Sequence, residues 1–106
     1  MAEMKLVEGE ELLIKKQVSH IKTLLVVPQP NPGNLFITNK RVVFTPTQGR
    51  SSSAFEYKLE EIASFSVGLM NTITLLTKDG EKHKLSGLFN KSIIEVLEKI
   101  NITREK

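Results

Sequence analysis

The stretch Gly33-Asn34-Leu35-Phe36-Ile37-Thr38-Asn39-Lys40-Arg41-Val42-Val43-Phe44 holds two short apolar runs separated by a polar pair. Each run is rich in β-branched and aromatic residues and has the length of a strand. The pair Asn39-Lys40 favours a tight turn, because Asn tolerates the left-handed backbone region and Thr38 can bond the turn locally. The stretch therefore predicts an antiparallel hairpin that buries Leu35, Ile37, Val42 and Phe44.

Further along the chain, apolar and polar residues alternate with period two, which indicates half-buried strands over residues 55–59, 63–67, 72–75 and 81–85. Asp79-Gly80 predicts a type I′ hairpin turn between the last two, with positive φ at both residues. Upstream, residues 11–21 and 23–27 form one bent strand or two. Two polar segments, 28–34 and 47–53, are interpreted as loops, the first because its three prolines donate no ladder hydrogen bond.

Near the C-terminus the period changes to that of a helix, with one apolar stripe formed by Phe89, Ile93, Val96, Leu97 and Ile100. Asn90 or Ser92 is expected to cap this helix, and Ser92 and Glu95 have the spacing of a capping box. About seven antiparallel strands followed by one helix predict a mainly β fold. We expect an orthogonal β-sandwich or barrel closed by the helix, in a single domain over residues 1–106.

Composition excludes several classes of protein. The chain has 106 residues, no cysteine and a net charge of +3. It has no apolar run near the roughly 20 residues of a membrane span, and its first residues lack the apolar core of a signal peptide. We therefore expect a cytoplasmic protein. There is no block of five like charges, no tryptophan and one tyrosine, so nucleic acid is not an expected partner.

Residues for catalysis or metal binding are sparse. His20 and His83 are the two histidines, and no HExxH motif, dense Asp cluster or glycine-rich phosphate loop occurs. His83 alternates with two lysines and shares a face with Leu85, so it is expected to be a half-buried core residue. The sequence thus predicts no enzyme, no cofactor and no metal site.

Five basic side chains are the candidates for a binding site: Lys40, Arg41, Lys58, Lys82 and Lys84. Lys58, Lys82 and Lys84 occupy outward strand positions, and all five could contact an anionic surface. A simple solvated face is the alternative interpretation. Arg41 opens the second strand of the hairpin, where its stem is expected to cover apolar surface while its head stays in water.

The hairpin stretch resembles the signature "G-x-L-(aromatic)-(aliphatic)-T-N-x-R-(aliphatic)-(aliphatic)-F" of GRAM domains in the pleckstrin-homology-like superfamily. The lead-in over residues 6–11, the link over residues 59–65 and the segment from Asp79-Gly80 to Phe89 are also similar to such domains. The resemblance runs from about Leu6 to Ile102, which is nearly the whole chain.

The resemblance implies a non-enzymatic module that binds membranes, phosphoinositides or proteins. Lipid-binding members carry Lys and Arg in the first strand-connecting loop, but residues 28–34 include no basic residue. The expected function is therefore weak, peripheral attachment to anionic lipid without phosphoinositide preference. The alternative is recognition of a protein or peptide, by strand addition at a sheet edge or in a groove beside the helix. The oligomeric state stays open.

Overall fold

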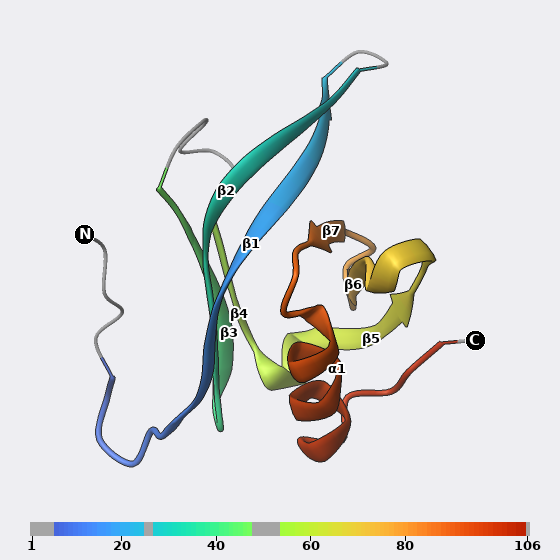
Figure 1. Cartoon of the computed structure of the whole chain (residues 1–106). Coiled ribbons are helices and arrows are strands. Elements are labelled where there is room, and N and C mark those ends of the chain that lie inside the picture. The colour runs from blue at the N-terminus through green and yellow to red at the C-terminus, as the bar shows by residue number, and fades with distance from the viewer. Residues whose placement is uncertain (1–5, 25–26, 48–53, 106) are drawn as a thin grey trace.

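The computed structural model describes residues 6–24, 27–47 and 54–105. Its elements follow the expected order of strands and then a helix (Figure 1): β1 (Leu12–Leu24), β2 (Val27–Thr38), β3 (Arg41–Pro46), β4 (Phe55–Lys58), β5 (Ile62–Val67), β6 (Ile73–Thr77), β7 (Lys82–Ser86) and α1 (Asn90–Lys99). Two 3-10 turns, η2 (Leu59–Glu61) and η3 (Leu69–Asn71), connect β4 to β5 and β5 to β6. No described helix is long and apolar enough to cross a bilayer.

The seven strands form one antiparallel sheet in the order β4-β3-β2-β1-β7-β6-β5. Strand β1 bonds β2 along its whole length and β7 over three residues only, from Ser19 to Ile21. At this narrow joint the sheet bends, so that β5 runs across the direction of β1–β4 in Figure 1. The result is the predicted barrel-like arrangement of antiparallel strands, open between its two edge strands β4 and β5.

The core lies between the two halves of the bent sheet and is closed by α1. The predicted hairpin face is confirmed, since Leu35, Ile37, Val42 and Phe44 are at most 1% exposed. From the helix, Ile93 and Leu97 are equally buried, while Val96 and Ile100 are half-buried against the same cluster. Burial of these apolar side chains is the main force that holds the helix on the sheet.

The prediction of a proline-rich loop over residues 28–34 is wrong, because these residues belong to β2. Pro28, Pro30 and Pro32 stand two residues apart, so their backbone nitrogens all face the same side of the strand. The Thr47 N–H donates to Pro32 O (2.9 Å), which identifies this side as the one away from β1. Strand β3 pairs with β2 only from Gly33 onward, so the missing N–H groups leave no ladder bond unmade.

The two segments 11–21 and 23–27 resolve into one strand, β1, followed by the start of β2. Residues 25–26, between the two strands, lie outside the described residues. The second predicted loop also lies almost wholly outside them, since only Thr47 of residues 47–53 is described.

The turn at Asn39-Lys40 is confirmed, but Asn39 does not have a positive φ. Instead Thr38 holds the turn, because its Oγ1 accepts the N–H groups of Lys40 and Arg41 (3.0 Å each). Gly33 is required here for close approach rather than for backbone freedom. A Cβ on Gly33 would lie 2.4 Å from Thr45 O on β3, so no larger residue fits.

The β6–β7 hairpin is present, although its turn is not type I′. Only Gly80 has a positive φ (94°), and the N–H of Gly80 donates to Thr77 O (3.1 Å). This is the geometry of a three-residue loop, in which one glycine takes the left-handed position. Asp79 contributes through its side chain instead, by accepting the hydroxyl of Thr77.

The helix begins differently from the prediction. Its N-cap is Phe89, which makes no side-chain capping bond, so Ser92 and Glu95 form no capping box there. Phe89 is also 46% exposed and does not belong to the buried stripe. Asn90 is the first helical residue, and its side chain turns inward to backbone carbonyls rather than capping the helix. Ile94, outside the predicted stripe, is buried instead.

Candidate functional site

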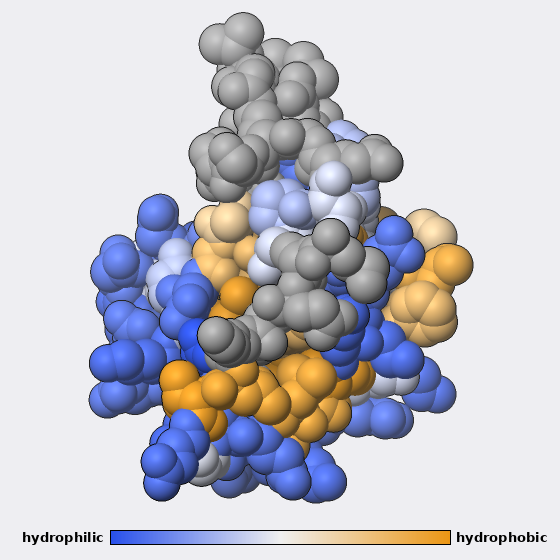
Figure 2. Space-filling model, turned by 90° about the vertical axis from the view of Figure 1, so that its left-hand side faces the viewer, coloured by the Kyte–Doolittle hydropathy of each residue, from blue (hydrophilic) through white to orange (hydrophobic). Residues whose placement is uncertain are grey.

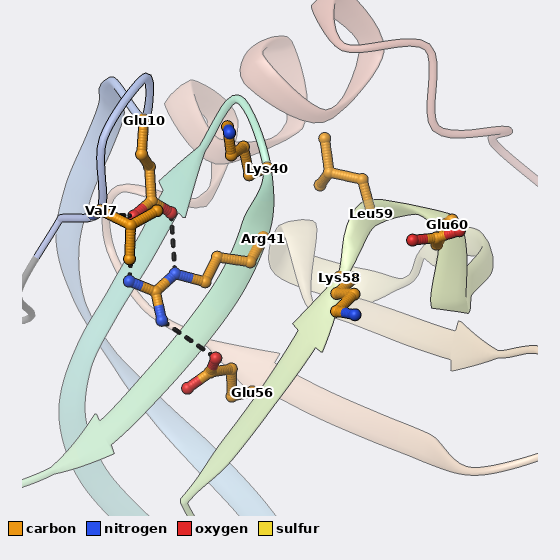
Figure 3. Close-up of a pocket in the computed structure, with 8 residues that line it drawn as sticks. All are labelled: Val7, Glu10, Lys40, Arg41, Glu56, Lys58, Leu59 and Glu60. Atoms are coloured by element: carbon orange, nitrogen blue, oxygen red, sulfur yellow. Dashed lines mark hydrogen bonds and ion pairs between the residues drawn. The ribbon is translucent and has the colours of Figure 1, made fainter.

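The five candidate cations fall into two groups. Arg41 and Lys58 face each other across β3 and β4, and Lys40 precedes Arg41 in the turn. These three line a pocket of about 510 Å³, together with Val7, Glu10, Glu56, Leu59 and Glu60 (Figure 3). Lys82 and Lys84 lie elsewhere, on β7, where β6 and β1 are their neighbours. The sequence could not predict this division, because it depends on which strands pair.

Arg41 is the centre of the pocket and is not a solvated cation, so this expectation was wrong. Its Nε donates to Glu10 Oε2 (2.7 Å) and its Nη2 donates to Glu10 Oε1 (2.9 Å), which is a bidentate pair. Its Nη1 donates to Glu56 Oε2 (2.9 Å). Only 19% of the Arg41 side chain is exposed, and the Glu10 side chain is fully covered. The two carboxylates raise the pKa of Arg41 above its already high value.

Glu10 fastens the N-terminal lead-in to the β2–β3 turn. Besides Arg41, its carboxylate accepts the Thr38 hydroxyl (2.7 Å) and the Val7 N–H (3.0 Å). The hydrogen bonds from Arg41 are the main reason why the pKa of Glu10 falls from its usual value near 4.5 to about 2, against the opposing effect of burial. Glu10 is therefore ionised at every ordinary pH.

Asn39 adds a second tie between the lead-in and the turn. The N–H of Glu11 donates to Asn39 Oδ1 (2.8 Å), and Asn39 Nδ2 donates to Gly9 O (3.2 Å). The residues T-N-x-R of the signature thus form the docking point of residues 9–11. Their joint role explains the signature by stability. The sequence did not identify Glu10 as the partner of Arg41, because Glu10 lies 31 positions upstream.

The charges around this pocket balance. Three basic side chains, Lys40, Arg41 and Lys58, share the lining with three carboxylates, Glu10, Glu56 and Glu60. An incoming phosphate would meet these carboxylates as well as the cations, and Arg41 already donates to two of them.

Hydrophobic surface gathers on the side of the molecule shown in Figure 2, with hydrophilic side chains around it. Val7 and Leu59 provide the apolar part of the pocket.

The β7 lysines have a different environment. Lys82 and Lys84 are exposed and alternate with the inward-facing His83 and Leu85. The strands that pair with β7 contain no Asp or Glu, since none occurs in residues 12–24 or 62–78. The nearest carboxylates in sequence are Asp79 and Glu81 in the β6–β7 turn. Lys84, farther from that turn, is thus a cation whose strand neighbours, Thr74 and Ile21, are uncharged.

The two histidines meet inside the barrel, which no sequence pattern indicated. His83 Nδ1 lies 3.2 Å from His20 Nε2, and His83 Nε2 lies 2.7 Å from the Tyr57 hydroxyl. The ring of His20 packs edge-on against Phe44 and Phe55. His83 is half-buried, as predicted. These contacts make the two histidines and Tyr57 a packed polar network. Nowhere in residues 6–24, 27–47 and 54–105 do three metal-ligating side chains gather.

A third feature is a cluster of exposed apolar side chains, which we call the apolar tip: Leu69, Met70, Leu88 and Phe89. Leu69 and Met70 belong to η3, between β5 and β6 (yellow in Figure 1), whereas Leu88 and Phe89 connect β7 to α1. A signal for them does exist in the sequence, because Gly68-Leu69-Met70-Asn71 and Gly87-Leu88-Phe89-Asn90 are variants of one Gly-Leu-apolar-Asn pattern.

Comparison with known proteins agrees with this architecture. The GRAM domain family model matches residues 2–102, so the chain belongs to the GRAM domain family. A comparison with curated protein sequences finds no match.

Solved structures with the same fold include pleckstrin-homology domains. The N-terminal PH domain of Vps36 is 24% identical with a TM-score of 0.58, and the alignment covers 91% of this chain and 85% of that one. The C-terminal domain of an unknown protein from Leishmania infantum is 21% identical with a TM-score of 0.68, over 87% and 84% of the two chains. The linker-DH/PH structure of p115-RhoGEF is 7% identical with a TM-score of 0.66, over 89% of this chain and 29% of that one.

Proposed function

We propose that this GRAM domain is a non-enzymatic binding module that attaches peripherally to anionic membrane surfaces. Lys84 and Lys82 on β7 are its principal contacts, Lys40 and Lys58 are secondary ones, and Arg41 acts as a structural residue. A cytoplasmic leaflet, which carries the anionic lipids of a cell, is the expected surface. One observation carries the proposal. Lys82 and Lys84 project from β7, and the two strands that pair with β7, β1 and β6, contain no carboxylate.

Electrostatic attraction of this kind is weak and lacks headgroup specificity. A lysine near an anionic leaflet contributes about 1 kcal/mol, and the attraction decays within a Debye length of about 8 Å at physiological salt. Lys82 and Lys84 stand on a strand rather than around a pocket, so they present no cage for one phosphorylated headgroup. Binding should therefore follow the surface charge of the membrane and not the identity of a phosphoinositide.

Recognition of a peptide by strand addition is the alternative, and one feature of β5 argues against it. The outer edge of β5 is already paired with the C-terminal segment. The Phe65 N–H donates to Thr103 O (2.8 Å), and the Glu105 N–H donates to Phe65 O (2.7 Å). An added strand would have to displace this segment first.

Vesicle co-sedimentation tests the proposal. Phosphatidylcholine vesicles with and without phosphatidylserine are compared at about 0.01 M and about 0.15 M salt, where the Debye lengths are about 30 Å and 8 Å. We expect binding to the phosphatidylserine vesicles that falls steeply between the two salt concentrations. The double variant Lys82→Glu with Lys84→Glu should weaken the low-salt binding by roughly tenfold or more.

The matched control is Lys40→Glu with Lys58→Glu, which also lowers the net charge from +3 to −1. It should weaken binding clearly less than the β7 pair. Equal losses in both double variants would contradict the assignment to β7 and indicate a response to total charge. If the wild-type protein fails to bind at low salt, the membrane proposal is wrong and a protein partner becomes the better hypothesis.

A further inference from the structure

The apolar tip is exposed to a degree that a folded monomer does not need. The side chains of Leu69, Met70 and Leu88 are 90%, 93% and 95% exposed, while Phe89 is 46% exposed. Single exposed apolar residues are ordinary, but here four of them stand on two connections that the hydrogen bond from Asn90 to Asn71 O holds side by side. Exposed apolar groups of this kind mark sites of interaction with a membrane or with another protein.

Asn90 fixes the two connections beside each other. Its Nδ2 donates to Asn71 O (2.8 Å), at the end of η3, and to Leu85 O (3.0 Å), on β7. The Asn90 side chain is almost fully buried. The two Gly-Leu-apolar-Asn segments are therefore tied together by the Asn of the second segment. The tip has a defined shape before it meets a ligand, so binding would cost little ordering entropy.

The backbone of η3 is left-handed at two successive positions. Met70 has φ 55° and ψ 32°, and Asn71 has φ 59°, so two successive non-glycine residues are left-handed. This conformation is unfavourable for a side chain with a Cβ, and more so for Met than for Asn. Burial does not compensate, because Met70 is almost completely exposed. Two successive left-handed residues are the geometry of a type I′ turn, and here the Thr72 N–H closes it on Leu69 O (3.1 Å). The turn that joins β5 to β6 therefore carries the Met70 side chain into solvent.

The charge around the tip identifies what covers it. Lys16 Nζ lies 4.8 Å from the centroid of the Phe89 ring, and Lys91 and Lys84 are exposed nearby in sequence. No Asp or Glu occurs in residues 12–24, 62–78 or 82–94, which include all the segments that build the tip. The turn carboxylates Asp79 and Glu81 lie at the opposite end of the β6–β7 hairpin. Apolar side chains on segments that carry Lys but no Asp or Glu complement the interface of an anionic bilayer.

We propose that the apolar tip inserts into the boundary between headgroups and acyl chains of an anionic bilayer, with Lys16, Lys84 and Lys91 at the level of the headgroups. This inference rests on the membrane attachment proposed above, but it adds a distinct contact. Electrostatic attachment is screened by salt, whereas burial of Leu88 and Met70 in lipid is not. Insertion also fixes the orientation, with η3 and the start of α1 facing the membrane.

Tryptophan fluorescence tests insertion directly, because the chain has no tryptophan of its own. Leu88→Trp is placed at a fully exposed position of the tip, and Val7→Trp at a half-exposed apolar position beside the carboxylates of the pocket. With phosphatidylserine-containing vesicles, the Trp at position 88 should shift to the blue and be quenched by brominated acyl chains. The Trp at position 7 should show neither change.

A second pair of measurements separates the two proposals. Met70→Ser with Leu88→Ser should keep the melting temperature of the wild-type protein, since both side chains are exposed, and should weaken vesicle binding at about 0.15 M salt by about tenfold. Lys82→Glu with Lys84→Glu should act mainly at low salt.

Three results would overturn the insertion. If the wild-type protein binds at low salt but the Trp of the Leu88→Trp variant is not quenched, insertion alone is refuted and the electrostatic attachment stays intact. A wild-type protein that binds no anionic vesicle would refute both proposals. A dimer in size-exclusion chromatography that the double Ser variant dissociates, without quenching by lipid, would show that the tip joins two copies of the chain.

Discussion

Two regions of this GRAM domain use their side chains in opposite ways. Around the β2–β3 hairpin the signature side chains are hydrogen-bonded or buried. Phe44 lies in the core, and Arg41 pairs with Glu10 outside it. At the apolar tip, by contrast, apolar side chains stand in solvent on a backbone with two left-handed residues. The first region stabilises the fold, and the second displays surface at the expense of stability.

This contrast shows how a family signature should be interpreted. The signature residues Thr38, Asn39 and Arg41 attract attention as a possible binding motif, yet their hydrogen bonds fasten the lead-in, hold the β2–β3 turn and join β3 to Glu56 of β4. The tip residues lie outside the central signature and carry no charge, and their exposure becomes visible only in the folded chain. The candidate function therefore moved from the charged signature to the β7 lysines and the apolar tip.

The largest effect should be the difference in unfolding free energy between two Phe→Ala substitutions, one in each region. Phe44→Ala removes a ring that is 1% exposed and packs against His20 and Phe55, so we expect a loss of about 3–5 kcal/mol in unfolding free energy. Phe89→Ala removes a half-exposed ring at the tip and should cost under about 1 kcal/mol. Urea denaturation measures both values. Similar losses would contradict the contrast between the two regions.

A second prediction concerns the pH dependence of the hairpin region. The pKa of Glu10 is about 2 in the folded protein and near 4.5 when unfolded, so the ionised form stabilises the fold above pH 4.5. This contribution is lost as the pH falls from about 4.5 toward 2, where the unfolded state binds one proton more.

Glu10→Gln should therefore lose part of this acid dependence in urea titrations across that pH window. Arg41→Met should lose it too and be less stable at neutral pH, whereas Lys58→Met should behave as the wild type. The carboxyl of Asp79, whose pKa is also lowered by the Thr77 hydroxyl, is present in every variant and cancels in the comparison. An unchanged pH profile in Glu10→Gln would disprove the structural role of the Glu10–Arg41 pair.

The smallest effect should have the opposite sign. Met70→Gly relieves a left-handed backbone at an exposed site and should raise stability by about 1 kcal/mol, while it weakens binding to anionic vesicles at physiological salt. Asn71→Gly is the control, with a smaller gain because Asn tolerates this conformation better. A less stable Met70→Gly protein would mean that the Met70 side chain supports the fold.

Several local details escaped prediction because they depend on neighbours distant in the sequence. Prolines at alternate positions suggested a loop, but strand β2 tolerates them since their nitrogens face a side that β3 does not reach. Phe89 fits the helical period, yet the helix begins just after it and leaves it at the rim. The pairing of His20 with His83 needs β1 and β7 to be adjacent, which no local pattern reports.

The sequence by itself determined the order of strands, the C-terminal helix and the inward face of the central hairpin. These follow from hydrophobic periodicity, which acts over a few residues and is written directly into the chain. Only the tertiary structure decided which charges are neutralised and which apolar side chains remain in water. Arg41 became structural because folding brings Glu10 from 31 positions away, and Leu88 became a candidate contact because nothing in the described fold covers it.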